Sequence, residues 1–354
     1  MMSYAGVRGT LGIDDPERTA RTASRAALVV LTVGFALARV AGVSLDLRSQ
    51  AAVYLVGMVA LNLPHGGYEH FANLRRRVSE FRFLYVAAYL SMVGAAVGLF
   101  LLAPLAGLAL FIAVAVAKGG LGDMHVLAAT TGTGHIRSRP QRWLAALARG
   151  GAVMAVPIVA FPATFSAFSG VIVGLVEPGA LGAVKPYFDV TGPLIGAGYG
   201  AVVLAHLGLG FAGRDGSGSW VADAVETLLL VAYFAVVPVV VAVGLYFPFW
   251  YSTRQVAREL AVDEEPARGG DLLGAPDATA GRVALRAWLV LVAGALATAG
   301  VAAVLWWVAP QPLGGANPLL GGVAFWTAFI SIIALPHVVV GGVLDRSRGI
   351  WHVP

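Results

Sequence analysis

The stretch GLALFIAVAVAKGGLGDMHVL, residues 107–127, decides the fold of this chain. It is almost continuously apolar, and a helix needs about 20 such residues to cross a bilayer. Comparable runs start near residues 26, 50, 82, 192, 222, 284 and 318. Closed barrels need alternating apolar and polar residues, which these runs lack. The sequence therefore predicts an all-α, polytopic transmembrane helical bundle that passes several times through the lipid bilayer of the cell membrane.

Composition narrows the functional classes. Of 354 residues, 58% are hydrophobic and 12% are charged, whereas roughly a quarter are charged in average soluble domains. The absence of cysteine excludes disulfides, thiolate metal sites and cysteine nucleophiles, so any metal must be held by nitrogen and oxygen. Although the net charge is +5, the arginines fall in loops between apolar runs, which indicates membrane anchoring and argues against nucleic acid as a partner.

The number of membrane segments depends on residues 150–183, which are apolar but interrupted by Pro157, Pro162 and Pro178. A single helix there gives nine segments, a hairpin folding near Pro162 gives ten, and the other runs alone give eight. Ten segments place both termini and most of the 24 basic residues on the cytoplasmic side, which the positive-inside tendency favours.

On this topology the chain has one transmembrane helical domain, residues 26–345. Residues 1–25 form a cytoplasmic N-terminal tail and residues 346–354 form a short C-terminal tail. The only long polar connection, residues 252–283, contains VDEEPARGGDLLGAPDATAG and is rich in Gly, Pro and Asp. It is predicted to be a flexible cytoplasmic loop and not a second domain.

Four segments that run inward on this topology end in polar side chains. Ionisable groups at membrane depth cost roughly 2.5 kcal/mol or more each, so their convergence in one layer indicates a function, most naturally a metal site walled by helices. Glu69 follows His65 by one turn and could orient that imidazole through a hydrogen bond. The residues of the layer are His65 and Glu69 in LNLPHGGYEHF, Asp123 and His125 in GDMHVL, Tyr251 and Gln255 in YFPFWYSTRQ, and His337 in LPHVVVGG.

The remaining histidines have simpler interpretations. His206 is expected in the outer half of its segment, away from the polar layer, where it would make a hydrogen bond between helices. His70, His135 and His352 fall at helix ends or in tails and are expected to be interfacial. The aromatic stretches FRFLYVAAYL and FPFWYS fit either an interfacial belt or the walls of a site for a flat polyene.

Five motifs, in order over residues 60–346, resemble the Brp/Blh family of membrane β-carotene 15,15'-dioxygenases. LPHGGYEH resembles its PHGALDH-type signature, and GDMHVL is similar to its second histidine motif, with Val126 and Leu127 where Phe-Gly is usual. YFPFWYSTRQVAREL is similar to its WHSxRH motif. The stretch RPQRWLAALARGGAVMAVPIVAFPATFSAF and the end LPHVVVGGVLDR are similar to the family's intervening segment and C-terminal helix.

The resemblance implies cleavage of β-carotene by O2 at its central double bond, giving two molecules of retinal, with a non-haem Fe(II) held by histidines. Carried over by position, His65 and His125 match metal ligands and catalytic residues. Tyr251 and Gln255 stand where the family has two further histidines, and Glu69 replaces an aspartate. His337 is a further candidate ligand, and Asp123 would support His125 from behind.

Two principal hypotheses follow, and the sequence leaves both open. The first is an iron-dependent dioxygenase with an altered coordination shell. The second is a non-catalytic relative that binds carotenoid or retinal without turnover, because two expected ligand histidines are Tyr251 and Gln255. A third, a proton-coupled transporter with Lys118 in an intramembrane relay, is weaker because no repeat or paired broken helices are visible.

Overall fold

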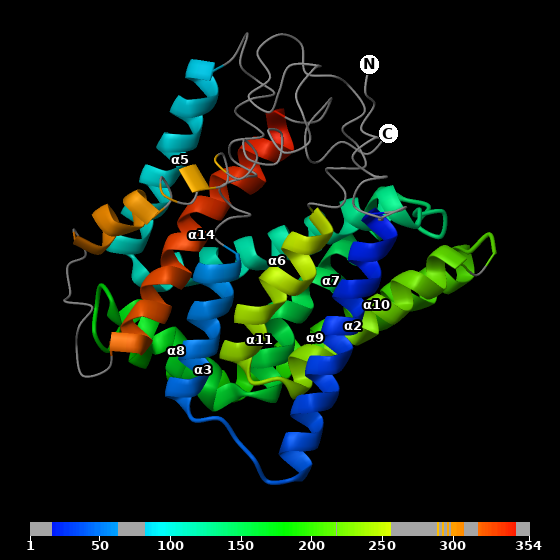
Figure 1. The fold of residues 1–354 in the computed structure, drawn as a ribbon, viewed down its shortest axis with the longest axis horizontal. Coiled ribbons are helices and arrows are strands. Elements are labelled where there is room, and N and C mark those ends of the chain that lie inside the picture. The colour runs from blue at the N-terminus through cyan, green and yellow to red at the C-terminus, as the bar shows by residue number, and fades with distance from the viewer. Residues whose placement is uncertain are drawn as a thin grey trace.

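A computed structural model describes residues 16–62, 82–216, 218–255, 289, 292–293, 296, 299–307 and 318–344. Every regular element within these residues is a helix, as predicted (Figure 1). The elements are α2 (Pro16–Val40), α3 (Leu47–Leu55), η1 (Val56–Leu61), α5 (Arg82–Leu102), α6 (Pro104–Thr130), α7 (Arg139–Ala160), α8 (Pro162–Gly174), η2 (Ala180–Ala183), η3 (Lys185–Tyr187), α9 (Phe188–Gly213), α10 (Gly218–Val236), α11 (Val239–Tyr246), η4 (Phe247–Ser252) and α14 (Pro318–Leu344).

Six described helices are long and apolar enough to cross a bilayer, which supports a multi-pass membrane protein. The total of ten segments and the cytoplasmic position of the termini stay predictions. The six are Arg18–Val40, Pro104–Thr130, Arg139–Ala160, Lys185–Gly213, Gly218–Val236 and Pro318–Pro336.

The predicted break at Pro162 is confirmed, but the helix after it is short. Helix α7 ends at Ala160, and α8 covers only 13 residues. A proline in the first turn of a helix costs nothing, because its missing N–H would have no partner there. At 13 residues, α8 is shorter than the roughly 20 residues that a full crossing requires. The apolar stretch after Pro162 is therefore too short to be a second full-length membrane helix.

The run from residue 222, predicted as one segment, is instead a hairpin of α10 and α11, so that prediction is wrong. The cause is Pro238, which lacks a backbone N–H and has an extended conformation (ψ 135°) where the helix would continue. The Tyr233 hydroxyl donates to the carbonyl of Ala242 at 2.9 Å, and Arg254 donates to Glu226 at 2.8 Å. Helix α11 and η4 therefore run back alongside α10.

The short helix α8 reverses the expected direction of the next helix, and the additional turn at Pro238 reverses it back for the helices that follow. Arg137, in the loop after α6, donates to the carbonyl of Gly213 at 2.7 Å, so α9 ends beside the end of α6. Helix α9 thus runs in the direction of α6, opposite to expectation. The additional turn at Pro238 then restores the expected direction, and η4 ends beside the C-terminal part of α6.

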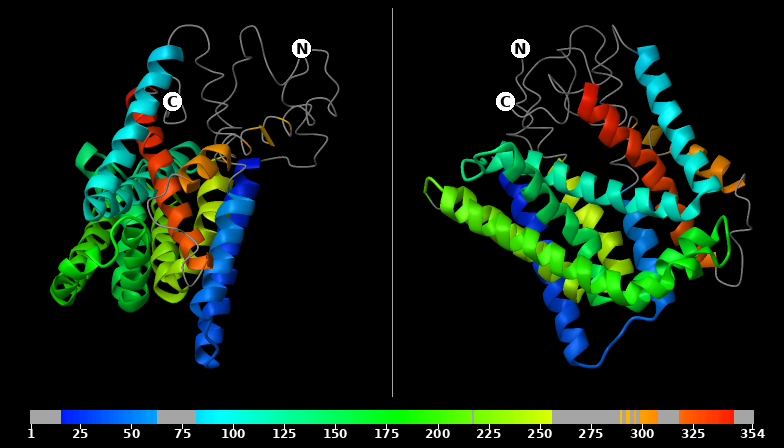
Figure 2. Two further views of the ribbon diagram at one scale, coloured as in Figure 1. Left: turned by 90° about the vertical axis from the view of Figure 1, so that its left-hand side faces the viewer. Right: turned by 180° about the vertical axis from the view of Figure 1, so that it is seen from behind.

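Close helix contacts depend on glycine. A Cβ on Gly120 would collide with the carbonyl of Ala146, and one on Gly150 would collide with the carbonyl of Val116. Helices α6 and α7 therefore approach through their backbones, as small residues allow in membrane proteins. Helix α14 packs against α5 and α3, while α6 runs across the directions of α2 and α3 (Figure 2).

Two π-helical turns occur at two of the sequence motifs. Turn η1 ends at Leu61, directly before LPHGGYEH, and η4 is the FPFWYS segment itself. They pack against each other, and the Ser252 hydroxyl donates to the Asn62 side-chain carbonyl at 2.6 Å. Since π-turns are rare and concentrate at functional sites, their pairing singles out this part of the fold.

Candidate functional site

The second half of α6 presents Lys118, Gly122 and His125 on one face, because positions three or four apart lie on the same side of a helix. Lys118 lines an apolar cavity, Gly122 contacts η4, and His125 is half-buried near the helix end. Asp123 projects from another side of the helix, toward α7. Helix α6 therefore contributes side chains both to the cavity and η4 on one side and to a polar contact with α7 on the other.

Tyr251 and Gln255 pack directly on Gly122. A Cβ at Gly122 would lie 2.7 Å from Tyr251 Cε2, 2.8 Å from Gln255 Nε2 and 3.2 Å from the Tyr251 hydroxyl. The two side chains are 3% and 5% exposed, so the missing Cβ is what leaves room for them. The third motif, far along the chain, thus contacts α6 one turn before His125.

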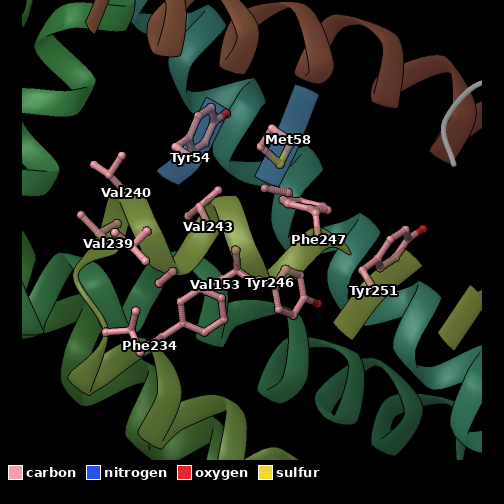
Figure 3. Packing of buried hydrophobic residues seen from close by; sticks show 14 of the residues in the cluster. Tyr54, Met58, Val153, Phe234, Val239, Val240, Val243, Tyr246, Phe247 and Tyr251 are labelled. Carbon is pink, nitrogen blue, oxygen red and sulfur yellow. The ribbon is translucent and has the colours of Figure 1, made fainter. Parts of the chain in front are cut away.

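A cavity of about 30 Å³ leads away from this contact, with α3, η1, α6, α11, η4 and α14 around it. Tyr54, Met58 and Phe247 lie together along it, and Tyr251 follows Phe247 by one turn (Figure 3). Phe247, Trp250 and Tyr251 are all buried, so most of the FPFWYS aromatics face the protein interior and not a lipid interface.

Beside the contact lies a buried arginine–carboxylate cluster, defined as Arg25, Asp123, Arg149, Asp223, Glu226 and Arg254. Arg149 is fully buried and binds three carboxylates at 2.6 Å: Asp123 through Nε, Asp223 through Nη1 and Glu226 through Nη2. Glu226 also accepts from Arg254 at 2.8 Å and from Arg25 at 2.9 Å. The cluster therefore joins α2, α6, α7 and α10 to the residues that follow η4.

Two histidines extend the cluster through Asp223. His135 Nε2 donates to Asp223 Oδ2 at 2.7 Å, and His206 Nε2 lies 3.2 Å from the same oxygen. Both side chains are buried, at 0% and 1% exposure. The prediction that His135 is interfacial is wrong, as is the prediction that His206 lies away from the polar layer. The reason is the direction of α9, which brings His206 beside α10.

The cluster balances three guanidinium groups against three carboxylates. Buried charges are tolerated when each is paired and hydrogen-bonded, because the lost hydration is then partly replaced. The guanidinium of Arg254 also stacks over Trp250, 4.1 Å from the ring centroid. Since Arg254 directly precedes Gln255 and follows η4, the cluster fixes the backbone that carries Tyr251 and Gln255.

Sequence reasoning missed Arg149, Asp223 and Glu226. A signal existed, because Asp223 and Glu226 stand three residues apart within an apolar run and so share one helix face. Arg149 lies within α7, whereas the predicted topology places most basic residues on the cytoplasmic side of the membrane. Arg149 is 74 residues from Asp223 and 77 residues from Glu226 in the sequence, so periodicity alone does not reveal their contact.

Several predicted site residues lie outside the described part of the chain. These are His65, Glu69, His70, His352 and the side chain of His337, whose backbone lies on α14 one turn beyond the cavity-lining Ala334. The chain enters the His65 motif directly after Asn62, which is bonded to Ser252. Among the described residues, no three His, Asp or Glu side chains gather as a metal-binding group.

The described donors fit a metal held by nitrogen and oxygen. An imidazole (His125) comes from α6, a phenol (Tyr251) from η4 and an amide (Gln255) from the residues after η4; Tyr251 and Gln255 pack on Gly122, one turn before His125. Each is an accepted ligand type for a first-row metal ion, although tyrosine and glutamine are less usual for Fe(II) than histidine. His65 and His337 would add two imidazoles.

Comparison with known proteins identifies the family of the chain. The family model described as "Beta-carotene 15,15'-dioxygenase" matches residues 56–345. Two strains of Halobacterium salinarum have a "Probable beta-carotene 15,15'-dioxygenase Brp" that is 55% identical over 337 residues, covering 94% of both chains. The "Probable beta-carotene 15,15'-dioxygenase Blh" of Halobacterium salinarum is 34% identical over 346 residues, covering 94% of this chain and 96% of that protein. No solved structure matches. With a family match from residue 56 to residue 345 and relatives aligned over nearly their whole length, this chain belongs to the Brp/Blh family of β-carotene 15,15'-dioxygenases.

Proposed function

We propose that this chain is a membrane dioxygenase that cleaves β-carotene, or a closely related carotenoid, at its central double bond. One O2 is consumed, each of its oxygen atoms becomes an aldehyde oxygen, and two molecules of retinal result. The observation that carries the proposal is the packing of Tyr251 and Gln255 on Gly122, one turn from His125. It joins the second and third family motifs one turn from Lys118 and Phe247, which line an apolar, aromatic-walled cavity.

Fe(II) held by His65, His125, Tyr251 and Gln255, with His337 as a further candidate, would supply the activation of O2. The protein itself would bind the substrate, exclude water and position the donor side chains. The cavity walls at Tyr54, Met58 and Phe247 are apolar and would hold the polyene and exclude water. The arginine–carboxylate cluster fixes α6 and η4 relative to each other, and thereby the positions of their donors.

A second function is favoured by a specific observation. Tyr251 and Gln255 replace two imidazoles, and a weaker donor set favours loss of the metal. The chain would then bind carotenoid or retinal in the same cavity without turnover. Metal content and product formation separate the two functions.

The test is expression in cells that make β-carotene, with extraction of retinal and measurement of iron per purified chain. The dioxygenase predicts retinal and about one iron per chain, one ion per site of this kind. His65→Ala and His125→Ala should each abolish retinal, whereas His352→Ala, in the C-terminal tail, should not. Bound carotenoid with neither iron nor retinal would support the binding protein and overturn the dioxygenase.

A further inference from the structure

Lysine is almost absent from this chain. Only Lys118 and Lys185 are lysines among the 24 basic residues, and the rest are arginines. Lys185 is exposed in η3, whereas Lys118 lies within the membrane-spanning helix α6. The chemical difference matters, because a lysine amine forms Schiff bases with carbonyl compounds and an always-protonated guanidinium does not.

Lys118 is placed differently from the cationic side chains of the arginine–carboxylate cluster. The carboxylates of that cluster are held by Arg25, Arg149 and Arg254. In the described part of the chain, none of them forms an ion pair with Lys118. Its Nζ lies 5.2 Å from the centroid of the Tyr251 ring, and its side chain lines the apolar cavity. Among the described residues, a salt bridge therefore does not account for this partly buried cation.

We propose that the Lys118 amine captures the aldehyde product of carotenoid cleavage as an imine. The inference rests on the proposed function for the source of the aldehyde. The amine nitrogen adds to the aldehyde carbon, the carbinolamine loses water, and the C=N bond replaces C=O. No oxidant or reductant is needed, and hydrolysis with one water reverses the step and releases the aldehyde.

The geometry supports this assignment. Cleavage beside Tyr251 leaves the new carbonyl at the end of a polyene that extends into the aromatic cavity. The amine stands at that end, one turn before Gly122 on the same face of α6. The cavity is narrow at about 30 Å³, so Met58 and Phe247 must shift to admit the polyene. Met58 can adapt through its three rotatable side-chain bonds.

The experiment adds all-trans-retinal to the purified full-length protein in detergent and then reduces it with sodium borohydride. Reduction converts an imine to a stable secondary amine, and peptide mass spectrometry locates the retinyl group. We expect most of the label on Lys118, unchanged labelling of Lys118 in Lys185→Arg, and complete loss of that label in Lys118→Arg. Label only on Lys185 or the N-terminus, or no label, would overturn the inference.

Because retinal is supplied directly, the outcome does not depend on cleavage. Carotenoid cleavage is measured on the same preparation. Cleavage without a Lys118 adduct overturns the inference and leaves the proposed function intact, whereas an adduct without cleavage supports the inference and counts against the dioxygenase. If Lys118→Arg does not fold, the location of the label in the wild-type protein and in Lys185→Arg decides the question.

Discussion

Replacing Arg149 by methionine removes the centre of the arginine–carboxylate cluster. The guanidinium is fully buried and makes a 2.6 Å contact with each of Asp123, Asp223 and Glu226. Among the described residues, Glu226 would keep Arg25 and Arg254, but Asp123 would keep only Arg254 at 3.7 Å, and Asp223 would keep His135, His206 and the Thr227 hydroxyl. The loss therefore falls on Asp123 and Asp223.

The expected cost follows from the burial of those carboxylates. Breaking a buried ion pair by removing one partner costs about 3–5 kcal/mol, because an uncompensated charge remains away from water. Methionine fills much of the volume, so the cavity contribution is small. The double variant Arg149→Met/Asp223→Asn restores charge balance and should be destabilised by less than the sum of the two single variants.

The assay is thermal unfolding of the purified protein in detergent, followed by tryptophan fluorescence. Arg142→Met is the matched control, since Arg142 is exposed on the same helix and its loss should change the free energy of unfolding by no more than about 0.5 kcal/mol. A loss in Arg149→Met no larger than in this control would refute the account of the cluster.

Four other outcomes are expected. Gly122→Ala should lower the free energy of unfolding by about 1–3 kcal/mol through overpacking against Tyr251 and Gln255, and it should lower the amount of bound iron. The control Gly208→Ala, where a Cβ meets nothing within 4 Å, should change neither quantity. Thermal unfolding and metal analysis measure the two effects. Tyr251→His/Gln255→His should raise iron per chain and retinal formation; unchanged values would count against these positions as ligands. Ser252→Ala should cost about 1 kcal/mol by removing the 2.6 Å bond to Asn62, measured in the same unfolding assay against Ser91→Ala, at an exposed position on α5. Removal of metal by a chelator should stop retinal formation, and added Fe(II), but not Mg²⁺, should restore it; activity that survives complete removal would exclude an iron-dependent reaction.

The helical fold could be predicted because each membrane segment carries its own signal, a long apolar run. The ends of segments were harder. Pro238 splits the run from residue 222, yet the flanking residues are so apolar that hydropathy passes over the break. Only the pairing of α10 with α11, through contacts such as Tyr233 with Ala242, makes the hairpin visible.

The site was predictable in part. The predicted topology, in which inward-running segments end in one layer, indicated that the residues around His125, Tyr251 and Gln255 would meet, and the structure brings Tyr251 and Gln255 onto Gly122. Their role as metal ligands stays a prediction. The arginine–carboxylate cluster was not foreseen, because its residues come from α2, α6, α7, α10 and the residues after η4 and meet only when these helices are packed.

The cluster also has a consequence for how the protein is made. Arg149 is synthesised 74 residues before Asp223 and 77 before Glu226, so α7 enters the bilayer before two of its arginine's partners exist. Asp123 arrives earlier and offers a single counter-charge. Helix α10 in turn carries two acids, Asp223 and Glu226, whose shared counter-ion Arg149 lies in a helix already inserted. Biogenesis of this protein is therefore expected to hold α6 and α7 together at the insertion machinery until α10 emerges.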